Sequence, residues 1–303
     1  MSNTTQKIRS TLSAKWPEPI RFADAAPFLI VHLACFAALW TGVSRRALLL
    51  AAALYVIRMF GITAGLHRYF SHRAFKTGRA FQFILAFIGQ SAAQGGVLWW
   101  ASKHRAHHRH SDTELDVHSP LRFGFLFAHI GWVYTASRGK TSYDNIKDLT
   151  RYPELVWLDN HIYVPALLLS ATCYLIAGPS GLVVGMIWST VALYHATFCI
   201  NSLAHILGSQ RYDTGDGSRN NWLLAIFTLG EGWHNNHHYF MASARQGFFW
   251  WELDITYLVL RALSWTQVVW DLKPVPEHVL RGERGGRQQN LPLYGASSNE
   301  RDS

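Results

Sequence analysis

Cysteine and charged residues are both scarce in this chain. Only three cysteines, Cys35, Cys173 and Cys199, occur among the 303 residues, and each lies inside an apolar run. Their number and placement exclude a disulfide framework and a CxxC zinc site. Charged residues make up 16% of the chain, which is low for a soluble protein of this size. The sequence also lacks a GxGxxG motif, so we expect no dinucleotide site.

Two other absences bear on where the protein works. The chain has no basic run with interleaved aromatics and no nucleic-acid reader motif, so its net charge of +9 does not indicate a nucleic-acid partner. The amino terminus, MSNTTQKIRS, is polar and lacks the apolar core of a cleaved signal peptide. We interpret the positive charge as loops that face an anionic membrane surface.

Four apolar stretches qualify as membrane spans, the first of them near the lower limit of about 17 residues. They comprise residues 27–43, 47–66, 162–178 and 182–200. The connector within each pair is only a few residues long, which predicts two helical hairpins whose tips face the same side. The rest of the chain carries 25 of the 28 Lys and Arg residues, so we expect it on the cytoplasmic side.

The predicted fold is an all-α membrane protein, with four transmembrane helices in two hairpins under a helical cytosolic cap. The predicted segments are a cytosolic N-terminal segment (1–26), the first hairpin (27–66), the first part of the cap (67–160), the second hairpin (161–204), the second part of the cap (205–280) and a polar, disordered tail (281–303). Both termini are expected in the cytoplasm. Residues 81–100 form a competing fifth apolar stretch. Three glutamines and two adjacent glycines interrupt it, and we predict an interfacial or cap-buried helix there.

Eight histidines fall in three clusters, all on the predicted cytoplasmic side, and a ninth ends the last apolar run. HRYFSH contains His67 and His72, HRAHH contains His104, His107 and His108, HNNHH contains His234, His237 and His238, and NSLAH contains His205. Histidine is the commonest transition-metal ligand. Nine imidazoles with almost no cysteine predict a di-metal site in the cap, with four or five nitrogen ligands for each ion.

The spacing within the clusters predicts how they are built. HRAHH and HNNHH share the spacing i, i+3, i+4, which places three imidazoles on one face of a helix. The i, i+5 spacing of HRYFSH separates its two histidines by ~140° around an α-helix. We therefore expect a helix to end between His67 and His72, so that His72 turns back towards the site.

The types of ligand reduce the number of candidate metals but do not identify the metal. A single zinc site needs four ligands and commonly uses cysteine or a carboxylate. Soluble di-iron bundles use carboxylates with a pair of ExxH motifs, and no such pair occurs in this chain. Nitrogen ligation with open coordination positions suits redox-active iron, but spacing alone leaves zinc, copper and manganese open.

The clusters and their surroundings resemble the membrane fatty acid desaturase family, and within it the Δ9 acyl-CoA (stearoyl-CoA) desaturases. The resemblance rests on GITAGLHRYFSHRAF, the DVHSP…FAHIGW stretch, NSLAH and GEGWHNNHH, and it covers roughly residues 27–260. It implies a four-helix membrane stem under a cytosolic cap that holds two iron ions (Fe²⁺). It also implies a reaction in which O2 and two electrons remove two hydrogens from a saturated acyl chain and leave a cis double bond.

The resemblance also gives roles to particular residues. The nine histidines become metal ligands and the catalytic set, and Asn201 would hold one metal through a water molecule. Trp100, Gln94 and Thr197 match the family positions that shape a bend in the substrate tunnel.

A separate hypothesis concerns the distal end of that tunnel. Tyr55 and Met59 lie one helical turn apart in the second predicted span, 12 and 8 residues before His67. Bulky side chains at these positions would close the tunnel and limit the length of the acyl chain.

The acyl carrier and the electron donor are open at this point. After FAHIGW the chain reads VYTASRGK, so the basic residues that would hold CoA phosphates are displaced to Arg138 and Lys140. Acyl-CoA, acyl-ACP and an intact membrane lipid all stay open as substrates. We find no cytochrome b5 domain and expect a separate electron donor of the ferredoxin, rubredoxin or cytochrome b5 type. The absence of that domain and the short hairpin tips indicate a bacterial inner membrane protein.

Three other functions compete with a desaturase. A membrane hydroxylase would use the same di-iron chemistry, and only product analysis separates the two. A non-catalytic metal-binding membrane protein would line its spans with ligands, whereas these histidines cluster in the cap. A zinc hydrolase needs a carboxylate base, which none of the histidine clusters contains.

Overall fold

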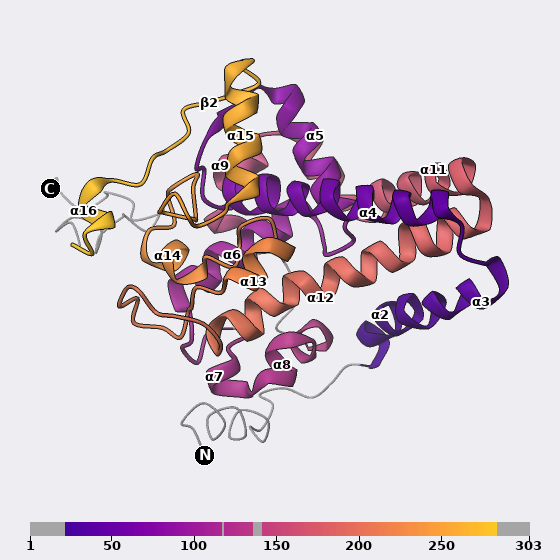
Figure 1. Ribbon diagram of the computed structural model, residues 1–303, viewed down its shortest axis with the longest axis horizontal. Coiled ribbons are helices and arrows are strands. Elements are labelled where there is room, and N and C mark those ends of the chain that lie inside the picture. The colour runs from indigo at the N-terminus through magenta and orange to yellow at the C-terminus, as the bar shows by residue number, and fades with distance from the viewer. Residues whose placement is uncertain (1–21, 117, 136–140, 284–303) are drawn as a thin grey trace, which may run out of the picture.

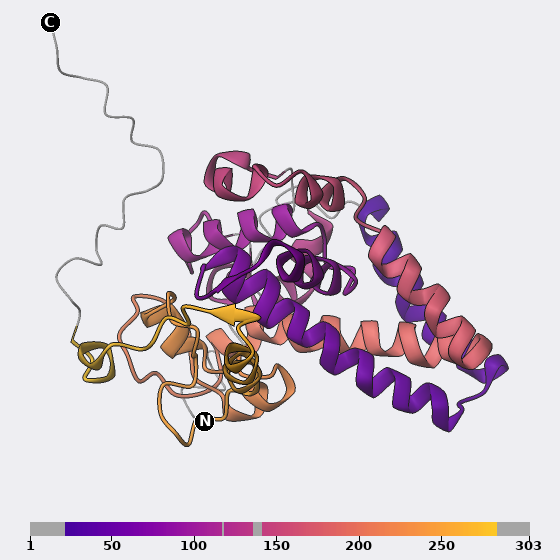
Figure 2. The same ribbon diagram turned by 90° about the horizontal axis from the view of Figure 1, so that it is seen from above.

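The computed structural model describes residues 22–116, 118–135 and 141–283, and this part of the chain is built mainly from helices (Figure 1). Two helical hairpins form one end of the molecule and a set of shorter helices forms the other (Figures 1 and 2). The mostly helical fold that the sequence predicts is therefore confirmed.

Each hairpin consists of a descending and a returning segment. The first comprises α2 (Phe22–Ala34), η1 (Cys35–Ala37) and α3 (Ala38–Thr41), followed by α4 (Arg45–Phe60) and the π-helix η2 (Gly61–Ser71). The second comprises α11 (Val164–Ser180), followed by the π-helix η6 (Gly181–Trp188), α12 (Ser189–Ser202) and η7 (Leu203–His205). The start of α4 is capped by Ser44, whose hydroxyl accepts a hydrogen bond from the backbone N–H of Ala47.

The two hairpin tips contact each other. Gly42 and Gly178 have φ angles of +70° and +60°, in the left-handed region that glycine adopts without steric cost. The hydroxyl of Ser180 accepts a hydrogen bond from the backbone N–H of Ser44 at 3.1 Å and donates one to the carbonyl of Gly42 at 3.0 Å. Both tips therefore lie at the same end of the molecule, as the short connectors predict.

Two helices of the described residues are long and apolar enough to cross a membrane. They span Arg45–Ser71 and Val164–His205. The second contains non-helical backbone at Ala177 and Gly178, where the chain reverses between α11 and η6. The first predicted span corresponds to the shorter apolar run Ala25–Thr41. An arrangement with four spans consequently stays a prediction.

The cap collects the remaining elements around the ends of α4 and α12. Its helices are α5 (Arg79–Gln90), α6 (Val97–His110), α7 (Pro120–Phe123), α8 (Phe125–His129), η3 (Gly131–Tyr134), η5 (Tyr143–Asn145), α9 (Lys147–Thr150), α10 (Pro153–Asn160), α13 (Trp222–Phe227), α14 (His234–Tyr239), α15 (Ile255–Trp265) and α16 (Glu277–Leu280). Two short strands, β1 (Lys76–Thr77) and β2 (Val269–Trp270), pair antiparallel and join the two parts of the cap.

The prediction of one helix over residues 81–100 is wrong. The chain breaks between α5 and α6, where Ala93 and Gly95 have φ angles of +57° and +117°. The side chain of Gln90 stabilises the break, since it accepts from the N–H of Val97 at 3.1 Å and donates to the carbonyl of Leu158 at 2.7 Å. With 12 residues, α5 is too short to span a membrane alone.

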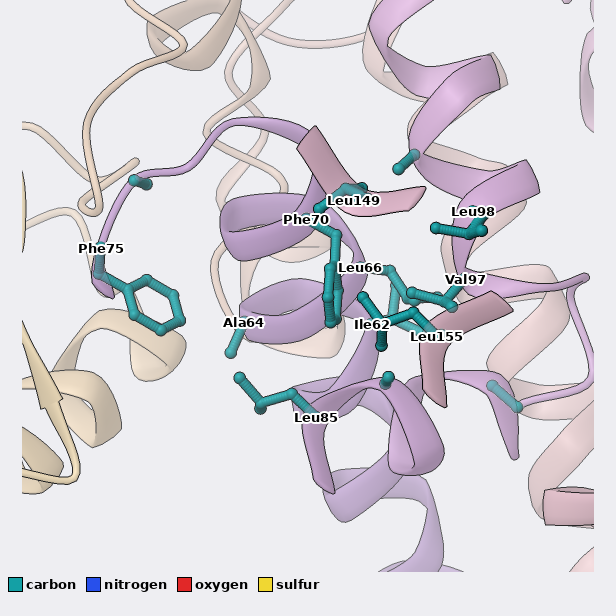
Figure 3. Packing of buried hydrophobic residues seen from close by; sticks show 14 of the residues in the cluster. Ile62, Ala64, Leu66, Phe70, Phe75, Leu85, Val97, Leu98, Leu149 and Leu155 are labelled. Carbon is teal, nitrogen blue, oxygen red and sulfur yellow. The ribbon is translucent and has the colours of Figure 1, made fainter. Parts of the chain in front are cut away.

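The largest hydrophobic core surrounds η2 (Figure 3). Ile62, Leu66 and Phe70 project from this π-helix towards Leu85 of α5 and Leu98 of α6, and all five are buried. Because η2 ends in the HRYFSH cluster, this packing fixes the position of the first histidines.

Candidate metal centre

All nine predicted ligand histidines lie together in the cap, in two groups. One group contains His67, His72, His104, His108 and His237, and the other contains His107, His205, His234 and His238. Within each group the nitrogens that could bind a metal lie within 4.8 Å of one another. Each group thus offers the four or five nitrogen ligands that the count of imidazoles predicts.

The two HxxHH clusters do not each serve one ion. On α6, His104 and His108 belong to the larger group and His107 belongs to the smaller one. On α14, His237 belongs to the larger group, and the other two histidines belong to the smaller one. The physical reason is the angle between successive side chains around a helix. Consecutive residues point ~100° apart, so His107 and His108 cannot reach the same point, whereas residues i and i+4 can. The expectation that three imidazoles of one cluster converge is therefore wrong.

The HRYFSH cluster is joined by a π-type turn. The N–H of His72 donates to the carbonyl of His67, five residues earlier, at 3.2 Å. This i→i+5 bond brings the two rings to a centroid distance of 4.8 Å. As predicted, His72 lies directly after the helix, but the helix that ends there is a π-helix, so both residues belong to one turn.

The distances between ring nitrogens fit metal binding. In the larger group, Nε2 atoms of neighbouring histidines lie 2.9–3.0 Å apart, and Nε2 of His205 lies 3.0 Å from Nε2 of His234 in the smaller group. Two nitrogens bound at ~2.1 Å to one ion, with ~90° between the bonds, lie ~3.0 Å apart. Nε2 of His238 is buried and has no hydrogen-bond partner among the described residues. A metal ion would satisfy it.

Carboxylates orient four of the rings through contacts with their Nδ1 atoms. Nδ1 of His107 contacts Asp116 at 3.1 Å, Nδ1 of His205 contacts Asp112 at 2.9 Å, and Nδ1 of His238 contacts Asp216 at 2.7 Å. Nδ1 of His67 is paired in the same way with Glu231. A hydrogen bond at Nδ1 fixes the tautomer that leaves Nε2 free for a metal and also raises the basicity of the ring.

The ionisation states agree with this arrangement. Burial lowers the pKa of five histidines well below the usual value of 6.5, and neighbouring imidazoles lower it further, so these rings are neutral. They are His72, His104, His108, His234 and His237. Burial acts to raise the pKa of Asp116, yet His107 and His118 hold it well below its usual value. These five neutral imidazoles and the ionised Asp116 are in the protonation states that metal ligation requires.

The four carboxylates are residues that sequence reasoning missed. Asp112 and Asp116 follow HRAHH closely, and Glu231 lies inside GEGWHNNHH, so proximity to the clusters was an available signal. Asp216 had no such signal, because it stands 15 residues after Asn201, the first residue of NSLAH, and reaches His238 only through the fold. His118, in DVHSP, also lies in the site and packs on His107 at a ring distance of 4.4 Å.

A mostly apolar cavity of about 320 Å³ adjoins both histidine groups. His67 and His104 of the larger group line it, together with His107 and His234 of the smaller one. Asn201 lines it as well, one helical turn before His205. A ligand bound in this cavity would therefore lie next to side chains of both histidine groups.

Four of the five predicted substrate residues line this cavity. Trp100 stacks on His104 with ring centroids 4.8 Å apart, and the Gln94 side-chain amide donates to the Thr197 hydroxyl at 2.9 Å. Met59 is fully buried at another part of the wall. Tyr55 is not among the lining residues, and its hydroxyl donates to the carbonyl of Phe227 at 2.6 Å.

Some predictions fall on residues outside the described ranges. These are Arg138 and Lys140, most of the N-terminal segment 1–26 and most of the tail 281–303.

Comparison with known proteins identifies what the chain is similar to. A family model for fatty acid desaturases matches residues 44–270. An acyl-CoA 5-desaturase of Anemone leveillei is 40% identical over 257 residues, which cover 82% of this chain and 78% of that protein. An sn-1 stearoyl-lipid 9-desaturase of Anabaena variabilis is 36% identical over 257 residues, 84% of this chain and 94% of that protein. A chloroplastic palmitoyl-monogalactosyldiacylglycerol delta-7 desaturase of Arabidopsis thaliana is 39% identical over 232 residues, 75% of this chain and 62% of that protein.

Proposed function

Because the chain belongs to the fatty acid desaturase family, we propose that it uses O2 to introduce a cis double bond at the Δ9 position of a saturated acyl chain. The observation that carries the proposal is the placement of two histidine groups beside one apolar cavity. The matched relatives are named for Δ5, Δ7 and Δ9 positions. We favour Δ9 because the sequence patterns GEGWHNNHH and NSLAH resemble that branch of the family.

The donor set suits two iron ions. The larger group would hold one ion through five imidazoles, and the smaller group would hold the other through four imidazoles, with Asn201 contributing through water. Bound iron supplies the O2 activation and the redox chemistry that removal of hydrogen from an unactivated methylene pair requires.

The residues of the chain supply binding, orientation and exclusion of water. A saturated chain has no polar group near its middle, so the shape of the cavity must decide which carbons face the metal groups. Trp100 fixes the wall next to His104, and the Gln94–Thr197 hydrogen bond joins the α5–α6 connection to α12 across the cavity. Apolar lining keeps water from the reacting carbons.

The proposal extends to the form of the acyl substrate, the electron donor and the location of the protein in the cell. The acyl chain arrives as a thioester or as part of a membrane lipid, since relatives are named for both kinds of substrate. A separate ferredoxin, rubredoxin or cytochrome b5 type protein supplies the electrons. The protein spans a bacterial inner membrane four times, with the cap and both termini in the cytoplasm.

Expression in a desaturase-deficient host with fatty acid profiling tests the function. We expect a Δ9 monounsaturated acid, and we expect it to disappear in His107→Ala and in His237→Ala, which each remove a ligand of a different group. His161→Ala is the matched control, because His161 is exposed, stacks on Trp157 and lies outside both groups.

Three outcomes would contradict the proposal. A hydroxylated product would indicate the related hydroxylase chemistry, and a double bond at another position would overturn Δ9. Metal analysis of active protein should give about two irons per chain, so an active zinc-only enzyme would overturn the assignment of iron.

A further inference from the structure

The cap carries a large exposed apolar surface that the proposed reaction does not use. It is formed by α13, by the segment 250–253 and by α15, and we call it the apron. Its most exposed aromatic side chains are Trp222 (65%), Phe227 (55%), Trp250 (85%), Trp251 (56%) and Trp265 (76%). Apolar surface of this extent on a folded protein marks a contact with another apolar partner.

Hydrogen bonds make the apron one structural unit. The N–H of Thr256, in the first turn of α15, donates to the carbonyl of Leu229, just after α13, at 2.9 Å. The indole N–H of Trp233 donates to the carbonyl of Leu253 at 2.8 Å. Trp251 lies 5.7 Å from Trp250 in an edge-to-face arrangement. The exposed side chains are thus presented on a fixed backbone.

The apron is continuous with an apolar helix that is long enough to cross a membrane. The Tyr55 hydroxyl, on α4, donates to the carbonyl of Phe227 at the end of α13, and the hydroxyls of Thr63 and Thr256 lie 2.7 Å apart. On α4 the neighbouring Val56 and Ile57 are exposed. The outer surfaces of α4, α13 and α15 therefore lie side by side, and Figure 2 shows α13 and α15 beside the cap end of α4.

Helix α15 has the form of an interfacial helix. Its axis runs across the direction of α4 (Figure 1). Thr256 and Leu260 are buried against the cap, whereas Leu258 and Val259 are exposed. Arg261 is exposed beside them. Tryptophan with apolar side chains on one side and arginine next to them is typical of helices that lie at the boundary of headgroups and acyl chains.

We propose that the apron inserts into the cytoplasmic-side leaflet of a lipid bilayer and anchors the cap to the membrane surface. The occupant is lipid because the apron adjoins the exposed side of α4 where Tyr55 contacts Phe227, and a membrane around α4 would reach α13 as well. Thr228, which follows Phe227, lines the cavity. The anchored α13 therefore keeps one wall of the cavity at the depth of the membrane surface, whatever reaction takes place inside.

Site-directed spin labelling tests the proposal without any measurement of activity. Cys35, Cys173 and Cys199 are replaced by alanine, and one cysteine is introduced by Trp250→Cys, Leu258→Cys or Glu277→Cys. Glu277 is the control, because α16 lies at the end of the molecule opposite the hairpin tips (Figures 1 and 2) and its side chain is 88% exposed. Each labelled protein is reconstituted in phosphatidylcholine–phosphatidylglycerol vesicles.

We expect labels at 250 and 258 to collide more often with O2, which concentrates in the acyl region, than with a water-soluble nickel chelate. The label at 277 should show the reverse. Collisions with nickel at 250 and 258 that equal those at 277 would overturn the proposal. Protection from both reagents would also overturn it, because it would indicate a protein partner or a second copy of the chain.

A second measurement covers the case in which the cysteine replacements prevent folding. Lipids brominated near the headgroup should quench part of the tryptophan fluorescence of the unmodified protein. That quenchable part should decrease in the Trp250→Phe/Trp251→Phe variant. An unchanged quenchable fraction would contradict insertion of the apron.

Discussion

The Asp216 carboxylate accepts hydrogen bonds from Nδ1 of His238, from the Thr214 hydroxyl at 2.6 Å and from the Ser218 N–H at 3.0 Å. In Asp216→Asn, the amide NH2 would face the N–H of His238, since the oxygen is held by Thr214 and Ser218. The ring would then lose its orientation. We expect the smaller group to bind metal ~10–100-fold more weakly than in the wild type. Metal titration of the purified protein measures this difference.

Asp144→Asn serves as the matched control for this change, because the Asp144 side chain is 93% exposed and remote in sequence from both groups. Equal metal affinity in Asp216→Asn and in the wild type would show that His238 does not depend on the carboxylate.

Met59 is the residue at which chain length can be tested. It is fully buried in the cavity wall, on the same helix as the exposed residue Ile57. Met59→Ala should lengthen the cavity and shift the products towards longer acyl chains, at a stability cost of about 2–5 kcal/mol. Fatty acid profiles with chains of different length provide the measurement, and Ile57→Ala should leave the profile unchanged. The same profile for Met59→Ala and the wild type would exclude a role for Met59 in chain length.

At the scale of elements, the position of HRYFSH depends on a close contact between η2 and α5. A Cβ atom added to Gly61 would lie 2.7 Å from the backbone nitrogen of Gly89, so a side chain there must push the helices apart. We expect Gly61→Ala to destabilise the protein by about 1–3 kcal/mol and to lower desaturation more than its loss of stability explains. Thermal unfolding and product yield at equal protein level are the two measurements.

Gly78→Ser is a suitable comparison for Gly61→Ala. Gly78 is the N-cap of α5, where serine is favoured, and no atom lies within 4 Å of its added Cβ. Full stability in Gly61→Ala would mean that the approach of η2 and α5 is not tight.

The hairpins could be predicted from the sequence, whereas the division of the histidines between two groups could not. Apolar runs and short connectors locate the hairpins well, because both are properties of neighbouring residues. The division of each HxxHH cluster between two groups depends on where α6 and α14 lie relative to each other. The pairing of Asp216 with His238 and of Gln94 with Thr197 likewise depends on tertiary contacts. Local spacing carries no information on either.

At the scale of the whole molecule, the contact between the hairpin tips bears on topology. Ser180 joins Ser44 and Gly42, so both tips must lie on the same side of any membrane around the hairpins. A cysteine introduced by Val43→Cys should react with an impermeant thiol reagent from one side of sealed vesicles, and one introduced by Glu277→Cys from the other. Labelling of both positions from the same side would contradict spans that connect the tips to the cap.

The carboxylates behind the histidines have a consequence for electroneutrality. Two divalent ions would bring four positive charges into a buried site whose nine imidazole ligands carry none when neutral. Asp112, Asp116, Asp216 and Glu231 supply four negative charges at Nδ1 of four of those rings. The paired Arg68 and Asp254 next to Glu231 add no net charge. An uncompensated charge is costly in a buried site. These four carboxylates therefore carry as much negative charge as a pair of divalent ions would bring in positive charge.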